Sequence, residues 1–133
     1  MKILNLLLFI HFPLWLGGCY YDYNAHNQHT QAPHIVDAEA ACWWNPSYQD
    51  FVWSFDALIS HPDGSFEISD VFVDIYQLSY LGTVYLSPDL GGYWRLVVDE
   101  EETPLWCGDP YEMEVVAYDR TGNWDVLNLS PSY

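Results

Sequence analysis

Basic side chains are almost absent from this sequence. Of its 133 residues only three are Lys or Arg, against nineteen Asp and Glu, and the net charge is −16 at pH 7. A polyanion of this density repels the phosphates of nucleic acids and the anionic faces of membranes. The composition therefore excludes nucleic acid as a partner, and a solvated surface that keeps the protein soluble is the plain reading of the acidity.

The sequence also lacks a hydrophobic run long enough to cross a bilayer. Its longest apolar stretch, residues 3–16, has fourteen residues and is interrupted by Asn5, His11 and Pro13, whereas a transmembrane helix needs about 20 residues. No segment has a sustained helical periodicity either. A membrane-spanning anchor and a helical domain are both disfavoured.

The first nineteen residues have a different organisation. Lys2 precedes the apolar stretch, which ends at Leu16-Gly17-Gly18-Cys19. This ending resembles the lipobox of bacterial lipoprotein signal peptides, which implies that residues 1–18 are a cleaved signal peptide and that Cys19 is acylated, for example with palmitate. The alternative is an ordinary secretory signal. By the same resemblance, Tyr20 in place of Asp after the cysteine implies the outer membrane if the bacterium is Gram-negative. Without Lys2 the net charge is −17.

Cysteine is scarce and its count is odd. Besides Cys19 there are only Cys42 and Cys107, and acylation of Cys19 would leave one pair in an exported protein. We expect a disulfide bond that closes a 65-residue loop, worth about 4 kcal/mol in the chain-entropy model. Two buried free thiols or a metal pair are the alternatives.

Residues 19–34 lack apolar periodicity, which predicts a flexible tether between the anchor and a single domain at 35–133. The tether carries His26, His29 and His34. Imidazoles at these spacings can bind zinc, copper or nickel, although a polar spacer is the simpler interpretation.

The rest of the chain alternates apolar and polar residues over short segments separated by Gly, Pro, Asp and Asn. This pattern predicts about seven strands in an all-β, antiparallel sandwich. The expected strands are residues 35–42, 51–59, 68–78, 83–86, 93–98, 111–117 and 124–129.

The segment Tyr111 to Asn123, YEMEVVAYDRTGN, resembles the penultimate strand and last hairpin of bacterial immunoglobulin-like and fibronectin type III-like domains. The resemblance implies an Ig-like sandwich, with Tyr111 at the tyrosine corner, and says little about function. The sequence departs from antibody domains because Cys42 and Cys107 would join the first strand to a loop, and because the third strand has no tryptophan.

Groups for catalysis are sparse. His61 is the only histidine of the predicted domain, so a Ser-His-Asp arrangement would depend on it, and nineteen acids make chance carboxylate pairs unavoidable. Calcium is the better metal candidate, with Asp99, Glu101 and Asp119 near strand ends as oxygen ligands, although the acids lack the Asp-x-Asp-x-Asp spacing and a solvated loop explains them equally. No cofactor is expected.

Tryptophan is plentiful for a domain of this size. Adjacent residues of a strand face opposite ways, so Trp43 and Trp44 cannot both enter the core. Exposed tryptophan suits sugar stacking or a protein partner, and packing against the disulfide is the alternative. The sequence therefore favours a lipid-anchored, non-enzymatic binding or structural module of the cell envelope, whose partner is an envelope protein or glycan. A carbohydrate-binding surface module and a small envelope hydrolase are the alternatives.

Overall fold

The structure of the protein is a computed structural model, which describes residues 31–103 and 105–133. Within this part the chain forms eight strands and three short 3₁₀ turns. The strands are β1 (His34–Asn45), β2 (Asp50–Ser60), β3 (Ile68–Gln77), β4 (Ser79–Tyr85), β5 (Ser87–Pro88), β6 (Tyr93–Asp99), β7 (Glu112–Asp119) and β8 (Trp124–Leu129). The 3₁₀ turns are η2 (Ser65–Glu67), η3 (Leu90–Gly92) and η4 (Glu100–Glu102).

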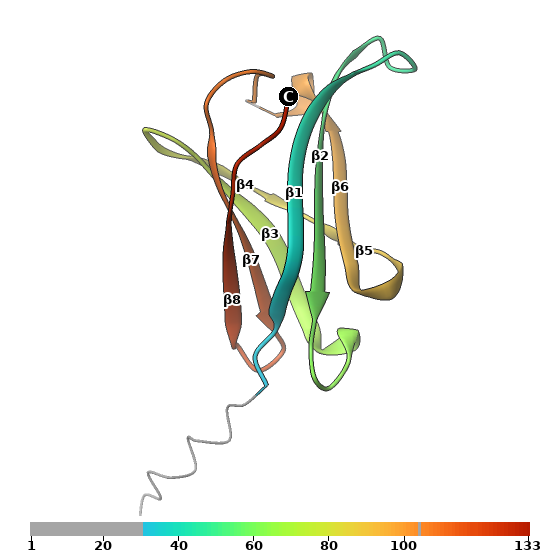
Figure 1. The fold of residues 1–133 in the computed structure, drawn as a ribbon, viewed down its shortest axis with the longest axis vertical. Coiled ribbons are helices and arrows are strands. Elements are labelled where there is room, and N and C mark those ends of the chain that lie inside the picture. Colours follow the sequence, from blue (N-terminus) through green and yellow to red (C-terminus); the bar gives the residue numbers. More distant parts are fainter. Residues whose placement is uncertain (1–30, 104) are drawn as a thin grey trace, which may run out of the picture.

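The strands form two antiparallel four-stranded sheets that face each other as a sandwich (Figure 1). The first sheet has the order β1-β2-β6-β5 and the second the order β4-β3-β7-β8. These are the orders of an Ig-like sandwich, in which strands A, B, E and D form one sheet and C, F and G the other, here with an added edge strand β4. The predicted all-β sandwich is confirmed.

The alternation predicted from the sequence fills the space between the sheets. Trp53, Phe55, Ala57 and Ile59 of β2 face inward from one sheet, and alternate residues of β3 and β7 face inward from the other. Trp53 occupies the centre, where its ring packs 5.9 Å from those of both Phe55 and Tyr111 and its Nε1 donates to the Leu105 carbonyl at 3.3 Å. The tryptophan at the centre of the core therefore lies on the second strand and not on the third.

The fold differs from the sequence prediction in four respects. No strand was expected at residues 87–88, where β5 pairs with β6, and the first strand, expected to end at residue 42, continues to Asn45. The fourth strand was expected over 83–86, but β4 begins at Ser79 because Leu78 adopts a φ of 63° and reverses the chain in a tight turn after β3. His34 was expected in the tether, but it opens β1 beside Asp125 of β8, with 3.4 Å between Nδ1 and Oδ2. The neighbouring Ile35 N–H donates to the same carboxylate at 2.9 Å.

A disulfide bond and a pair of backbone hydrogen bonds close the end of the sandwich that lies opposite His34. The Cys42–Cys107 disulfide joins β1 to the loop before β7, with 5.7 Å between the Cα atoms, as the sequence predicted. Beside it, Ser132 pairs with β1, donating to the Ala40 carbonyl and accepting from the Cys42 N–H, both at 2.9 Å. The segment after β8 therefore crosses from the second sheet to the first (Figure 1).

No helix in the described part of the chain is long and apolar enough to span a membrane.

Candidate functional site

Besides Trp43 and Tyr133, four large aromatic side chains are exposed at the closed end of the sandwich. They are Trp44 and Tyr48 of the β1–β2 hairpin, Phe51 at the start of β2, and Trp106 in the loop before β7. Trp44 is 51% and Trp106 66% exposed. We call these four residues the aromatic end. In Figure 1 the hairpin lies at the end opposite the point where the chain enters β1.

The backbone holds the aromatic end in place. Trp106 precedes Cys107, whose disulfide bond fixes this loop beside β1. The Trp106 N–H donates to the Tyr111 hydroxyl at 2.9 Å, and the Cys107 N–H donates to Glu100 Oε1 at 2.8 Å. The bond from Trp106 is a tyrosine corner, in which a tyrosine before the penultimate strand bonds backbone a few residues upstream, and it confirms the position predicted for Tyr111. The backbone of Trp106 is thus held in place, while its indole is exposed.

Both of the tryptophans singled out from the sequence are partly exposed. Trp43 lies opposite Val52 on the outer face of the first sheet, whereas Trp44 continues the inward-facing row beyond the core. There Trp44 meets Phe51 edge to face at 5.4 Å. Neither side chain is absorbed by the core, so both are available to a ligand, and Trp44 belongs to the aromatic end.

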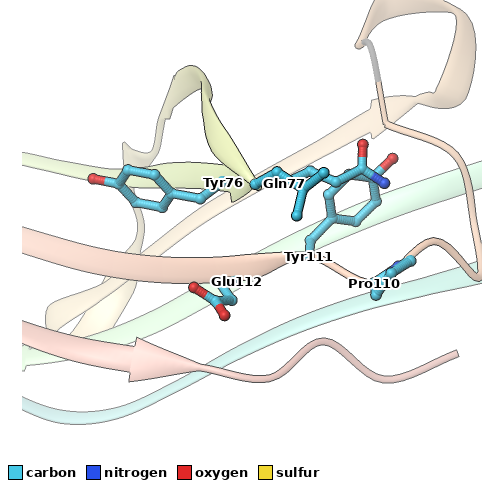
Figure 2. A pocket seen from close by; sticks show the side chains of 6 residues that line it. Tyr76, Gln77, Pro110, Tyr111 and Glu112 are labelled. Atoms are coloured by element: carbon cyan, nitrogen blue, oxygen red, sulfur yellow. The ribbon is translucent and has the colours of Figure 1, made fainter.

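A shallow pocket of about 430 Å³ opens where β3 turns into β4. It is lined by Tyr76, Gln77, Leu78, Pro110, Tyr111 and Glu112. In Figure 2 the side chain of Tyr76 points away from Gln77 and Tyr111 along the sheet. Leu78 is fully exposed in the left-handed conformation, which costs a residue with a Cβ about 1–2 kcal/mol. This pocket was not predicted, because it is formed by two loops that are distant along the chain.

The outer face of the second sheet carries an apolar row next to an acidic row. Tyr85, Phe72, Val116 and Val126 lie opposite one another across the four strands, and the next row is Thr83, Asp74, Glu114 and Asn128. The Phe72 ring lies 5.5 Å from that of Tyr85 and 6.1 Å from that of Tyr118. The face therefore carries aromatic and aliphatic side chains in one row and two carboxylates in the next.

The calcium candidates do not form one site. Asp99 pairs with Val52 at the start of β2, whereas Asp119 lies beside the turn after β2. The intervening part of β2 separates them by roughly 25 Å at about 3.3 Å per residue. Within the described residues no three His, Cys, Asp or Glu side chains are grouped as metal ligands would be. Glu101 is exposed in η4, on the Asp99 side.

The carboxylate of Asp119 is occupied by donors of its own turn. Oδ1 accepts the N–H and hydroxyl of Thr121, both at 2.8 Å, and the Asn123 N–H at 2.9 Å, while Oδ2 accepts the Asn123 side-chain amide at 2.8 Å. Burial would raise the pKa of Asp119, but these hydrogen bonds outweigh it and hold the pKa well below the ordinary value. A carboxylate surrounded by N–H and O–H donors is a structural anion and a poor calcium ligand.

His61 forms a buried pair with Asp119 that the sequence did not predict. Its Nε2 lies 3.5 Å from Asp119 Oδ2, and both side chains are almost completely buried. Its Nδ1 accepts the Asp63 N–H at 3.1 Å. Because one ring nitrogen faces Asp119 and the other accepts a backbone N–H, neither is placed to take a proton from a serine. The pair therefore connects the turn after β2 to the β7–β8 turn.

Three residues singled out from the sequence, Cys19, His26 and His29, lie outside the described residues. Comparison of the chain with protein-family models, with curated proteins and with solved structures finds no match. The functional argument therefore rests on the sequence and on the surfaces described above.

Proposed function

We propose that the protein is an exported, lipid-anchored module of the bacterial cell envelope that binds a partner without catalysing a reaction. The ending Leu16-Gly17-Gly18-Cys19 supports the anchor. The aromatic end supports binding, and it is the observation that carries the proposal: large rigid aromatic side chains are exposed at the end of the domain opposite the N-terminal attachment. The flexible tether predicted at the opposite end leaves the aromatic end free to face away from the membrane.

The chemistry of the aromatic end suits recognition. Aromatic residues are enriched at the centres of binding surfaces, because they bury much area with few rotatable bonds. The tyrosine corner and the disulfide limit the freedom of Trp106 before a partner arrives, so less ordering entropy is lost on binding. The acids elsewhere on the surface keep the module soluble and repel anionic partners.

A glycan is the second candidate partner. Exposed indole rings stack on the apolar faces of sugar rings, and both Trp44 and Trp106 have half or more of their surface exposed. A neutral polysaccharide would also avoid repulsion by the net charge of −16. A glycan would be bound by the same residues as a protein partner, so one set of variants tests both kinds of partner.

Site-specific photo-crosslinking in the envelope tests the proposal. A photoreactive phenylalanine analogue at position 44 or 106 is expected to give a discrete adduct with a protein or glycan. Trp124, which is 57% exposed at the opposite end of the domain, is the matched control. Adducts at position 124 with none at 44 and 106 would place the binding surface elsewhere. Titration of the Trp44→Ala and Trp106→Ala variants with neutral oligosaccharides, followed by tryptophan fluorescence, separates the glycan from the protein partner.

A further inference from the structure

Within the described residues the sandwich has four edge strands, β1, β5, β8 and β4, and only β4 has a free edge without proline, charge or a neighbouring segment. β5 contains Pro88, β1 pairs with Ser132, and β8 lies beside β1, to which Asp125 is hydrogen-bonded. β4 has no strand partner on its outer side among residues 31–103 and 105–133. Its sequence, SYLGTVY, contains no charge and no proline, and its bulge at Leu81 leaves residues 82–85 in regular register with β3. Soluble proteins normally protect an exposed edge with one of these devices, because the free backbone groups of an edge attract another strand.

The register identifies the free backbone groups. The Leu86 N–H donates to the Val71 carbonyl at 2.9 Å, so these two residues form a hydrogen-bonded pair. Hydrogen-bonded and non-hydrogen-bonded pairs alternate along an antiparallel ladder. Val84 therefore also directs its N–H and C=O toward β3, whereas Thr83 and Tyr85 direct theirs toward the open side. Among the described residues, no backbone hydrogen bond of Thr83 or Tyr85 to a further element is present.

The side chains beside the open edge define what would fit there. On the outer face, Asp74 and Glu114 continue the row of Thr83, and Tyr85 and Phe72 form the aromatic row next to it. A strand added to β4 would lie roughly 10 Å from β3, since neighbouring strands are about 4.8 Å apart. A Lys or Arg side chain can reach the Asp74 carboxylate on β3 at that distance, whereas Glu114 lies one strand further away on β7 and adds only to the negative potential of the face. The cations also favour the aromatic faces of Tyr85 and Phe72.

The inner side of the edge is apolar. A small cavity of about 50 Å³ lies there, lined by Ile75, Leu81, Gly82, Thr83, Val84, Thr103 and Leu105. An added strand alternates its side chains between the two faces, so its inward residues would extend the core with small apolar groups. The occupant that fits is an extended segment that alternates basic and small apolar residues.

A second copy of this protein does not match that description. β4 contains no basic residue, and the chain has only three Lys and Arg in all. Two copies paired through β4 would set two chains of net charge −16 side by side and bring their rows of Asp74 and Glu114 close together, which is unfavourable.

We propose that β4 receives an extended basic segment of a partner protein, which adds to the second sheet as a fifth strand. Main-chain hydrogen bonds to Thr83 and Tyr85 supply affinity, and the acidic and aromatic rows select the basic side chains, as in other cases of strand addition. The site is formed by β4 and the outer face of the second sheet and uses no residue of the aromatic end. The test of the β4 site is therefore independent of the binding proposed for the aromatic end.

The test uses the full-length protein in detergent and an eight-residue peptide of alternating lysine and valine with blocked ends. Residue-resolved amide hydrogen exchange is expected to show slowing at Thr83 and Tyr85 and no change at Val84, whose N–H faces β3. A peptide with the same four lysines and four valines in two blocks keeps the charge and loses the alternation. We expect it to bind at least tenfold more weakly.

Two variants complete the experiment. Asp74→Asn combined with Glu114→Gln keeps the shape of the side chains and is expected to weaken binding of the alternating peptide at least tenfold. Asp37→Asn combined with Glu39→Gln makes the same charge change at two exposed residues of β1, in the other sheet, and should leave the affinity unchanged. Equal binding of both peptides would reduce the site to nonspecific attraction and overturn the proposal. Protection of other amides instead of Thr83 and Tyr85 would overturn it too, as would self-association through β4 in the absence of peptide.

Discussion

Replacing Asp119 by Ala is expected to destabilise the domain more than any other single substitution of an acidic residue. Asp119 is buried, and its carboxylate accepts four hydrogen bonds from Thr121 and Asn123. It also lies against the buried Nε2 of His61. The substitution removes the acceptor for all four donors and leaves the imidazole facing an empty space.

The size of the loss depends on whether each donor can hydrogen-bond to water once the carboxylate is removed. A hydrogen bond to a charged group is worth about 1.5–3 kcal/mol net, but these bonds form a network and their energies do not add. Thr121 is exposed, so its donors regain water, whereas His61 is buried and does not. We expect a loss of about 3 kcal/mol in the free energy of unfolding, which for a domain of this size lowers Tm by roughly 15 °C.

The same carboxylate gives the prediction a pH dependence. The pKa of Asp119 is lower in the folded protein than its ordinary value of 3.8. A lowered folded-state pKa means that the stabilisation is complete above the unfolded-state pKa and is lost as the pH falls toward the folded-state pKa. The difference in stability between wild type and Asp119→Asn should therefore be constant from pH 7 to about 5 and shrink below pH 4.

Urea unfolding followed by tryptophan fluorescence measures both quantities, since Trp53 is fully buried. Arg120→Ala is the matched control, because Arg120 is exposed in the same turn and its side chain makes no ion pair among the described residues. It should change the free energy of unfolding by less than about 0.5 kcal/mol. An Asp119→Ala protein as stable as this control, or a loss that does not vary below pH 4, would refute the reasoning.

Three further predictions concern the anchor, the disulfide and divalent cations. Cys19→Ser should abolish incorporation of labelled palmitate and release the protein from membranes, and a soluble, unlabelled wild type would contradict acylation. Cys42→Ala should lower the free energy of unfolding by up to about 4 kcal/mol, as expected for a 65-residue loop. Urea titrations measure this loss, and the reduced wild-type protein should be destabilised to the same extent. Calcium chloride should raise Tm no more than sodium chloride of equal ionic strength, because Asp99 and Asp119 lie apart; a saturable calcium isotherm lost in Glu101→Gln would show a specific site.

Much of the fold follows from local alternation. The strand predicted at 124–129 coincides with β8, and the inward residues of β3 and β7 were those of the predicted apolar faces. The start of β4 was missed because it depends on the left-handed turn at Leu78, and leucine gives no signal of positive φ. Periodicity specifies faces well and turn geometry poorly.

The candidate sites were predictable only in part. The disulfide was predicted from the number of cysteines. Strand alternation predicted that Trp43 and Trp44 do not both enter the core, but it did not predict that both are exposed. The pair of His61 and Asp119, the mounting of Trp106 on Tyr111, and the unprotected edge of β4 all depend on which distant segments meet. A single sequence carries little information on such long-range contacts.

The pairing of Ser132 with β1 bears on when this domain can fold. β1 is synthesised first, yet part of its hydrogen bonding comes from residue 132, and the Tyr133 ring packs 6.0 Å from that of Trp53 at the centre of the core. Contacts between the start and the end of a domain form slowly, because the intervening loop must close first. A nascent chain cannot complete this sandwich before residue 133 has been made. For the export proposed above, delayed closure of this kind would keep the polypeptide extended during synthesis, the condition in which a secretion channel accepts a chain.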